Sequence, residues 1–165
     1  MRTLGLLSGE VSQWCTTDLM HAYCGAHHQG MSIVHGVTAP QVTQAEIGRL
    51  VDAFYSRVQV DPVIGPIFNE QIEDWPAHLA LLKEFWAAVL LGAGSFRGNP
   101  LETHLKMTLS GEHFERWLAL FRETALQLLP EERAEVFISK SRRIAETFQR
   151  GIAARRSGLG IVGDR

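Results

Sequence analysis

The sequence predicts an all-α protein, because apolar residues recur three and four positions apart from Thr43 almost to the end of the chain. Residues that cap helices stand at the start of most of these segments, and no run of residues alternates as a half-buried strand would. The chain has 165 residues, of which 45% are hydrophobic and 21% charged. These values are typical of one globular domain with a single sizeable core.

The chain divides into three parts. We expect residues 1–42 to form a poorly ordered N-terminal extension, because the apolar residues there follow no period. Residues 43–153 should form the helical domain and residues 154–165 a C-terminal tail, with fraying from Gly151 onward. Met31 offers an alternative start of translation.

The first helix has a clear start and a clear end. Thr43 and Glu46 have the spacing of a capping box, in which each side chain binds a backbone amide that the helix leaves unpaired. The apolar face of this helix comprises Ile47, Leu50, Val51, Phe54, Tyr55 and Val58. Asp61 and Pro62 end it, and residues 62–68 should form a short apolar turn or 3₁₀ segment.

Two further helices follow, one long and one short. The long helix should run from about residue 76 to residue 91 and end in a glycine-rich break. Its apolar face comprises Leu79, Leu82, Phe85, Trp86, Val89 and Leu90. The short helix should begin with Asn99 as N-cap, Pro100 at the first helical position and Glu102 at the capping-box position. This short helix carries His104.

Two long helices complete the domain. Ser110 is placed to cap the first, and Pro130, followed by two glutamates, opens the second. Their apolar positions are Phe114, Trp117, Leu118, Phe121, Ala125 and Leu128 on the first, and Val136, Phe137, Ile144, Phe148 and Ile152 on the second.

Charge and hydropathy exclude several classes of function. The 16 Lys and Arg residues do not gather in one run and the formal net charge is -2, so the chain lacks the basic patch of a nucleic-acid binder. No apolar run approaches the roughly 18 residues of a membrane span, and the first residues do not form a secretory signal. We therefore expect a cytoplasmic protein, and a monomer, since no exposed apolar stripe calls for a partner.

A zinc site in the N-terminal stretch is an alternative with little support. Cys15, His21, Cys24 and His27 carry the right ligand atoms, but their spacing fits no established zinc pattern. A leader without a structural role is the simpler interpretation.

Four side chains of the helical region can carry chemistry. His104 stands among Leu101, Leu105 and Met107, and a neutral imidazole in apolar surroundings is a good iron ligand. Taken alone, such a histidine more often hydrogen-bonds to a carbonyl inside the core. Tyr55, His78 and Trp117 are likewise explained singly by core packing or by exposure. His113 should lie at the surface near the start of its helix.

The order and spacing of these residues resemble the group III truncated haemoglobins. The motifs that agree are Phe54-Tyr55, Gly65-Pro66-Ile67-Phe68, Trp75 to His78, Phe85-Trp86, Pro100-Leu101 to His104, and Trp117-Leu118. The resemblance covers residues 46 to 151, and it is specific because several motifs agree in type, order and separation. It implies a two-over-two helical sandwich around haem b. The N-terminal extension, residues 1–42, has no counterpart in that family.

The resemblance implies roles for individual residues. His104 matches the proximal histidine that binds iron, and Tyr55 matches the distal tyrosine that donates a hydrogen bond to a gas ligand. Trp117 matches the tryptophan whose indole N–H points into the distal pocket, and His78 the distal histidine that gates entry. Phe68, Leu82, Phe85, Trp86, Leu101 and Met107 would then line the haem. Arg97 and Lys106 are candidates for pairing with the haem propionates.

Three functions compete on this evidence. The first is reversible binding and transport of O₂, with binding of related diatomic ligands such as NO and CO and slow release through two distal donors. The second is a haem-dependent redox activity, peroxidase-like or NO-detoxifying, which would need a separate reductase because the chain has no flavin or nicotinamide fingerprint. The third is a helical interaction domain without haem.

Overall fold

The computed structural model describes residues 41–93 and 96–158. The expectations for residues 1–40, including the zinc alternative, lie outside this part of the chain. Within it the structure is helical and contains no strand, as predicted. The helices are α2 (Gln44–Val60), α3 (Gly65–Gln71), α4 (Trp75–Leu91), α5 (Pro100–Leu105), α6 (Gly111–Leu128) and α7 (Glu131–Arg156).

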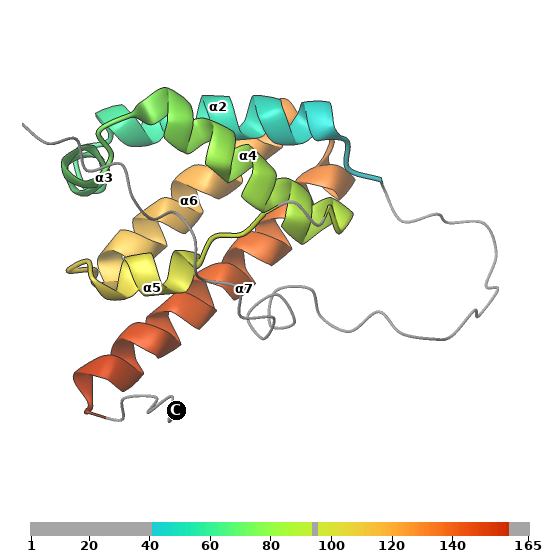
Figure 1. Ribbon diagram of the computed structural model, residues 1–165. Coiled ribbons are helices and arrows are strands. Elements are labelled where there is room, and N and C mark those ends of the chain that lie inside the picture. The colour runs from blue at the N-terminus through green and yellow to red at the C-terminus, as the bar shows by residue number, and fades with distance from the viewer. Residues whose placement is uncertain (1–40, 94–95, 159–165) are drawn as a thin grey trace, which may run out of the picture.

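The long helices form two crossed layers. Helices α2 and α4 pack against each other in one layer, and α6 and α7 pack against each other in the second (Figure 1). Helix α2 also packs on α6, which joins the layers, and the short α5 packs on α7. This is the two-over-two sandwich. No helix among the described residues is long and apolar enough to cross a lipid bilayer.

The predicted caps of α2 and α5 are confirmed. At the start of α2, the Glu46 carboxylate accepts from the Thr43 amide at 2.9 Å, and the Thr43 hydroxyl accepts from the Glu46 amide at 3.2 Å. At the start of α5, the Asn99 side chain accepts from the Glu102 amide at 3.2 Å. The Glu102 carboxylate does not return a capping bond and instead lies 3.5 Å from Lys106 Nζ.

Both ends of the helical domain extend beyond the expected limits of 43 and 153. Val42 is only 9% exposed and belongs to the core, in the position from which an apolar residue packs on the first turn of α2. Helix α7 continues through the glycine at 151, where fraying was expected, and ends at Arg156. The Arg156 guanidinium donates to the Leu109 carbonyl at 2.9 Å and so holds the last turn against the loop before α6.

Helix α3 replaces the turn or 3₁₀ segment expected at residues 62–68. Its first residue lies so close to α2 that a Cβ on Gly65 would stand 2.9 Å from the Val58 carbonyl oxygen. Only glycine permits this approach. The close contact fixes where α3 begins, and therefore where Phe68 lies.

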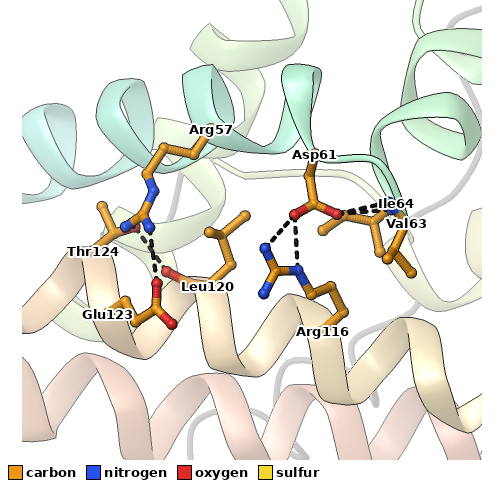
Figure 2. A network of polar contacts seen from close by, with 8 residues as sticks. All are labelled: Arg57, Asp61, Val63, Ile64, Arg116, Leu120, Glu123 and Thr124. Atoms are coloured by element: carbon orange, nitrogen blue, oxygen red, sulfur yellow. Dashed lines mark hydrogen bonds and ion pairs between the residues drawn. The ribbon is translucent and has the colours of Figure 1, made fainter.

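A buried aspartate shapes the turn between α2 and α3. Asp61 is 5% exposed and its Oδ1 accepts from the amides of Val63 and Ile64 at 3.0 and 3.1 Å (Figure 2). Its Oδ2 accepts from Arg116 of α6 at 2.8 Å. Burial raises the pKa of Asp61, but the Arg116 guanidinium and the two amides outweigh burial and hold the pKa below its ordinary value.

A second arginine completes the polar contact between α2 and α6. The Arg57 guanidinium donates to the Thr124 hydroxyl at 2.8 Å and to the Glu123 carboxylate at 2.8 Å (Figure 2). The Thr124 hydroxyl in turn donates to the Leu120 carbonyl at 2.7 Å. These bonds fix the rotation of α2 relative to α6, and both helices contribute to the cavity described below.

Asp61→Ala should lower the free energy of unfolding by about 2–3 kcal/mol, because two turn amides and a guanidinium lose their acceptor. Asp61→Asn should cost less, since its amide oxygen still accepts from the two backbone amides. Urea unfolding at pH 7 measures both variants. Equal losses for Ala and Asn would show that the turn amides contribute nothing.

The same carboxylate should make stability depend on acid. A lowered folded-state pKa contributes stability that is present above the unfolded pKa of about 3.9 and is lost as pH falls through the lower folded pKa. Urea midpoints of the wild type should therefore decline below about pH 4. The decline should be shallower in Asp61→Asn, and identical slopes in the two proteins would contradict this linkage.

Candidate functional site

A cavity of about 560 Å³ opens between the two layers. Its size is within the range of small-molecule and cofactor pockets. The walls come from every described helix from α2 to α7 and are mostly aliphatic and aromatic. Its polar lining includes Tyr55, His78, Asn99, Thr103 and His104.

His104 enters the cavity from α5. Its Nδ1 lies 2.6 Å from the carbonyl oxygen of Pro100. Because a carbonyl only accepts, Nδ1 must carry the proton and Nε2 is left with its lone pair. Burial lowers the pKa of His104 although the Pro100 carbonyl opposes this, so the imidazole is neutral near pH 7. A neutral imidazole with one nitrogen hydrogen-bonded is the form that binds iron.

Tyr55 and Trp117 form a polar pair in the cavity. Tyr55 of α2 is 4% exposed, and both it and Trp117 of α6 line the cavity. An indole N–H only donates, so Trp117 can act on the tyrosine oxygen as a donor and leaves the tyrosine's own proton free to donate. Burial raises the pKa of Tyr55 far above its ordinary value, although the Trp117 side chain opposes this. The hydroxyl therefore keeps its proton at any physiological pH.

His78 lies beside this pair, on the first turns of α4. Its ring is 6.3 Å from that of Tyr55 and 6.0 Å from that of Trp75, in edge-to-face arrangements. Burial lowers the pKa of His78, and His104 lowers it further through space. The lowered pKa leaves His78 with a neutral ring near pH 7. Phe68 of α3 closes this side, with its ring 6.1 Å from that of Tyr55.

A stack of aromatic rings supports one wall of the cavity, which Trp86 and Trp117 line. Trp117 stacks on Phe121 at 5.2 Å, and Phe121 stacks on Trp86 at 5.1 Å. Phe54 meets the edges of both Trp117 and Phe121. The rings come from α2, α4 and α6, so this wall is itself a contact between the two layers.

Most of the residues expected around the haem lie on this cavity. Tyr55, Phe68, His78, Leu82, Phe85, Trp86, His104, Met107 and Trp117 all line it. Leu101 does not: its side chain points at α7, where its Cδ1 would lie 2.9 Å from a Cβ on Gly151. It thus packs α5 on α7.

The two candidates for pairing with the haem propionates stand outside the cavity lining. Neither Arg97 nor Lys106 lines the cavity; Arg97 is exposed, and Lys106 pairs with Glu102. His113, expected at the surface, is instead half-buried and lines the cavity. Its Nδ1 accepts from the Ser110 amide at 3.1 Å, so it caps α6 and carries its proton on Nε2.

Several lining residues were not predicted. Phe96, Phe114, Ile144 and Phe148 line the cavity, and Phe148 stacks on His104 with ring centroids 4.3 Å apart. Ile144 and Phe148 are four residues apart and were placed on the buried stripe of the last helix. The stripe itself was visible in the sequence, but which neighbour it faces depends on how α5 lies on α7.

This arrangement fits a flat apolar cofactor that carries a metal. The cavity offers aromatic walls for the apolar surface of such a group and one histidine nitrogen, His104 Nε2, with a free lone pair. It also offers the Tyr55 hydroxyl as a donor, held on a different helix from His104. A two-layer helical sandwich with these features defines a globin.

Comparison with known proteins agrees. A sequence profile of the family described as bacterial-like globin matches residues 42–149. The chain is 39% identical over 113 residues to the group 3 truncated hemoglobin ctb of Campylobacter jejuni, covering 66% of this chain and 89% of that protein. A crystal structure of group III truncated hemoglobin from Campylobacter jejuni matches with a TM-score of 0.65 and 36% identity, covering 70% of this chain and 95% of that chain.

The chain therefore belongs to the bacterial-like globin family, as a group III truncated haemoglobin. It is a haem-binding globin, which leaves the haem-free interaction domain without support.

Proposed function

We propose that this protein reversibly binds O₂ and related diatomic ligands on haem b, with His104 as the iron ligand and Tyr55 as the hydrogen-bond donor to the gas. The observation that carries the proposal is the hydrogen bond from His104 Nδ1 to the Pro100 carbonyl, which leaves Nε2 with its lone pair in the same cavity as Tyr55 and Trp117. When bound, the haem supplies an iron with an open position for a diatomic molecule.

The two distal donors act in series. In this role Trp117 donates to the tyrosine oxygen, which directs the Tyr55 proton away from the indole and toward the cavity. A ligand that gains negative character on binding is stabilised by such a donor. The proposal thus assigns Trp117 a role through Tyr55, whereas the family resemblance implies two residues that both donate to the ligand.

The partner of His104 favours ligand binding over peroxidase-like chemistry. A peroxidase strengthens its proximal histidine with a carboxylate, whereas His104 Nδ1 donates to the neutral Pro100 carbonyl. The nearest acid along the chain, Glu102, pairs with Lys106 instead. NO detoxification stays as a second role, in which a separate reductase would supply the electrons to a monomeric globin.

The optical spectrum of the haem-reconstituted protein tests the iron ligand. Wild type should give a stable ferrous haem spectrum after dithionite reduction. His104→Gly should lose or radically change it, and added imidazole should restore it by occupying the space of the missing ring. A His104→Gly spectrum identical to that of wild type would remove His104 as the ligand.

The same spectrum decides the role of His78. A six-coordinate ferrous spectrum that becomes five-coordinate in His78→Leu would make His78 a second iron ligand. A five-coordinate spectrum in both proteins would leave His78 as a gate beside the cavity, and CO association should then be faster in His78→Leu.

Tyr55→Phe should raise the O₂ dissociation rate roughly fivefold to fifteenfold, because the ligand loses one hydrogen bond of about 1–1.5 kcal/mol. Stopped-flow replacement of O₂ by CO measures this rate. A wild-type rate no slower than that of Tyr55→Phe would contradict the role of the hydroxyl.

A double-mutant cycle tests whether Trp117 acts through Tyr55. Trp117→Phe alone should raise the O₂ dissociation rate by a smaller factor than Tyr55→Phe. In the Tyr55→Phe background it should change the rate little, because the hydroxyl that it orients is already gone. Two factors that multiply independently would show that Trp117 donates to the ligand itself.

A further inference from the structure

The helix that carries His104 cannot fix this side chain by itself. Helix α5 has six residues, none of them buried, and a helix this short is marginal without tertiary contacts. Its support is α7, onto which it packs at Gly151. A Cβ at that position would lie 2.9 Å from Leu101 Cδ1 and 3.6 Å from Leu105 Cδ2, so the two leucines fit around the glycine.

This close approach brings the His104 imidazole onto the ring of Phe148. The two ring centroids are 4.3 Å apart and the ring planes are inclined by 29°, which is a stacked arrangement. Phe148 is 5% exposed and lies on the buried face of α7 between Ile144 and Ile152. Because the Phe148 side chain is buried, its ring has little freedom to move and presents a fixed flat surface to the histidine.

The hydrogen bond and the stack restrain different degrees of freedom. The bond from Nδ1 to the Pro100 carbonyl fixes the direction of one ring atom. It leaves the imidazole free to tilt about that direction, and the χ2 torsion of histidine has a broad energy well. A flat ring against one face removes the tilt. Together the two contacts define where the Nε2 lone pair points.

We propose that Phe148 is a positioning residue that sets the plane of the His104 imidazole; this inference rests on the proposed function. Gly151 allows α5 to approach α7 closely enough for the contact between the two rings. Phe148 does not ligate the iron in this role. It restricts the orientations from which Nε2 binds the metal, so the iron–histidine bond is formed in one geometry instead of several.

Resonance Raman spectroscopy of the reduced, haem-loaded, full-length protein tests this inference. Phe148→Leu keeps an apolar side chain but removes the flat face, so the iron–histidine stretching band should shift and broaden. Haem transfer to apomyoglobin should become roughly threefold to tenfold faster, as expected from the loss of one aromatic contact. Phe148→Tyr retains the ring face and should keep the wild-type band.

Phe137→Leu is the matched control, because Phe137 is 0% exposed on the same helix but does not line the cavity. It should destabilise the fold and leave the band unchanged. An unchanged band in Phe148→Leu, or equal changes in both variants, would overturn the proposal. A wild-type protein without an iron–histidine band would instead overturn His104 as the ligand, which separates the two failures.

A measurement on the unmutated protein covers the case in which Phe148→Leu does not fold. In the diamagnetic CO-saturated protein, NMR should show nuclear Overhauser contacts between the rings of Phe148 and His104. The His104 ring protons should also be shifted upfield by the Phe148 ring current. Absence of both signals would show that the rings do not stack when haem is bound, and would overturn the proposal.

Discussion

The fold depends on a wall of stacked aromatic rings that keeps a large apolar cavity from collapsing. Protein interiors normally close to nearly crystalline density, and a space of about 560 Å³ in a small helical domain works against that tendency. Trp117 and Trp86 line the cavity, and Phe121 stacks on both of them behind the lining. Phe54 meets the edges of Trp117 and Phe121. Stacked rings from three helices resist the rearrangement that closing the cavity would need, because each ring is held by its neighbours.

Side chains that line the cavity are positioned by contacts made outside it. His104 depends on α7 through Phe148 and Gly151, because no residue of its own short helix is fully buried. Phe68 depends on the turn at Asp61, which is fixed in turn by Arg116 of α6. Both short helices that contribute to the pocket, α3 and α5, are thus positioned by contacts with a distant part of the chain.

This dependence explains what the sequence could and could not predict. Caps and helical periodicity are local, so the starts of α2 and α5 were predicted correctly. The α-helical form of α3 was not, because it rests on Asp61 meeting an arginine 55 residues away. The end of α7 was placed too early for the same reason, since Arg156 binds a carbonyl 47 residues away. Which of Leu101 and Phe148 faces the pocket likewise follows from the packing of α5 on α7, which no single segment encodes.

The neutral acceptor at His104 also bears on electron supply. In the proposed role as iron ligand, an imidazole that donates a hydrogen bond from Nδ1 to a peptide carbonyl would carry less negative charge than one paired with a carboxylate. Negative charge on such a ligand stabilises ferric more than ferrous iron, so the carbonyl partner would raise the reduction potential relative to a carboxylate partner. A haem held in this way would be easier to reduce, and a weaker cellular reductant would be enough to return it to the ferrous form.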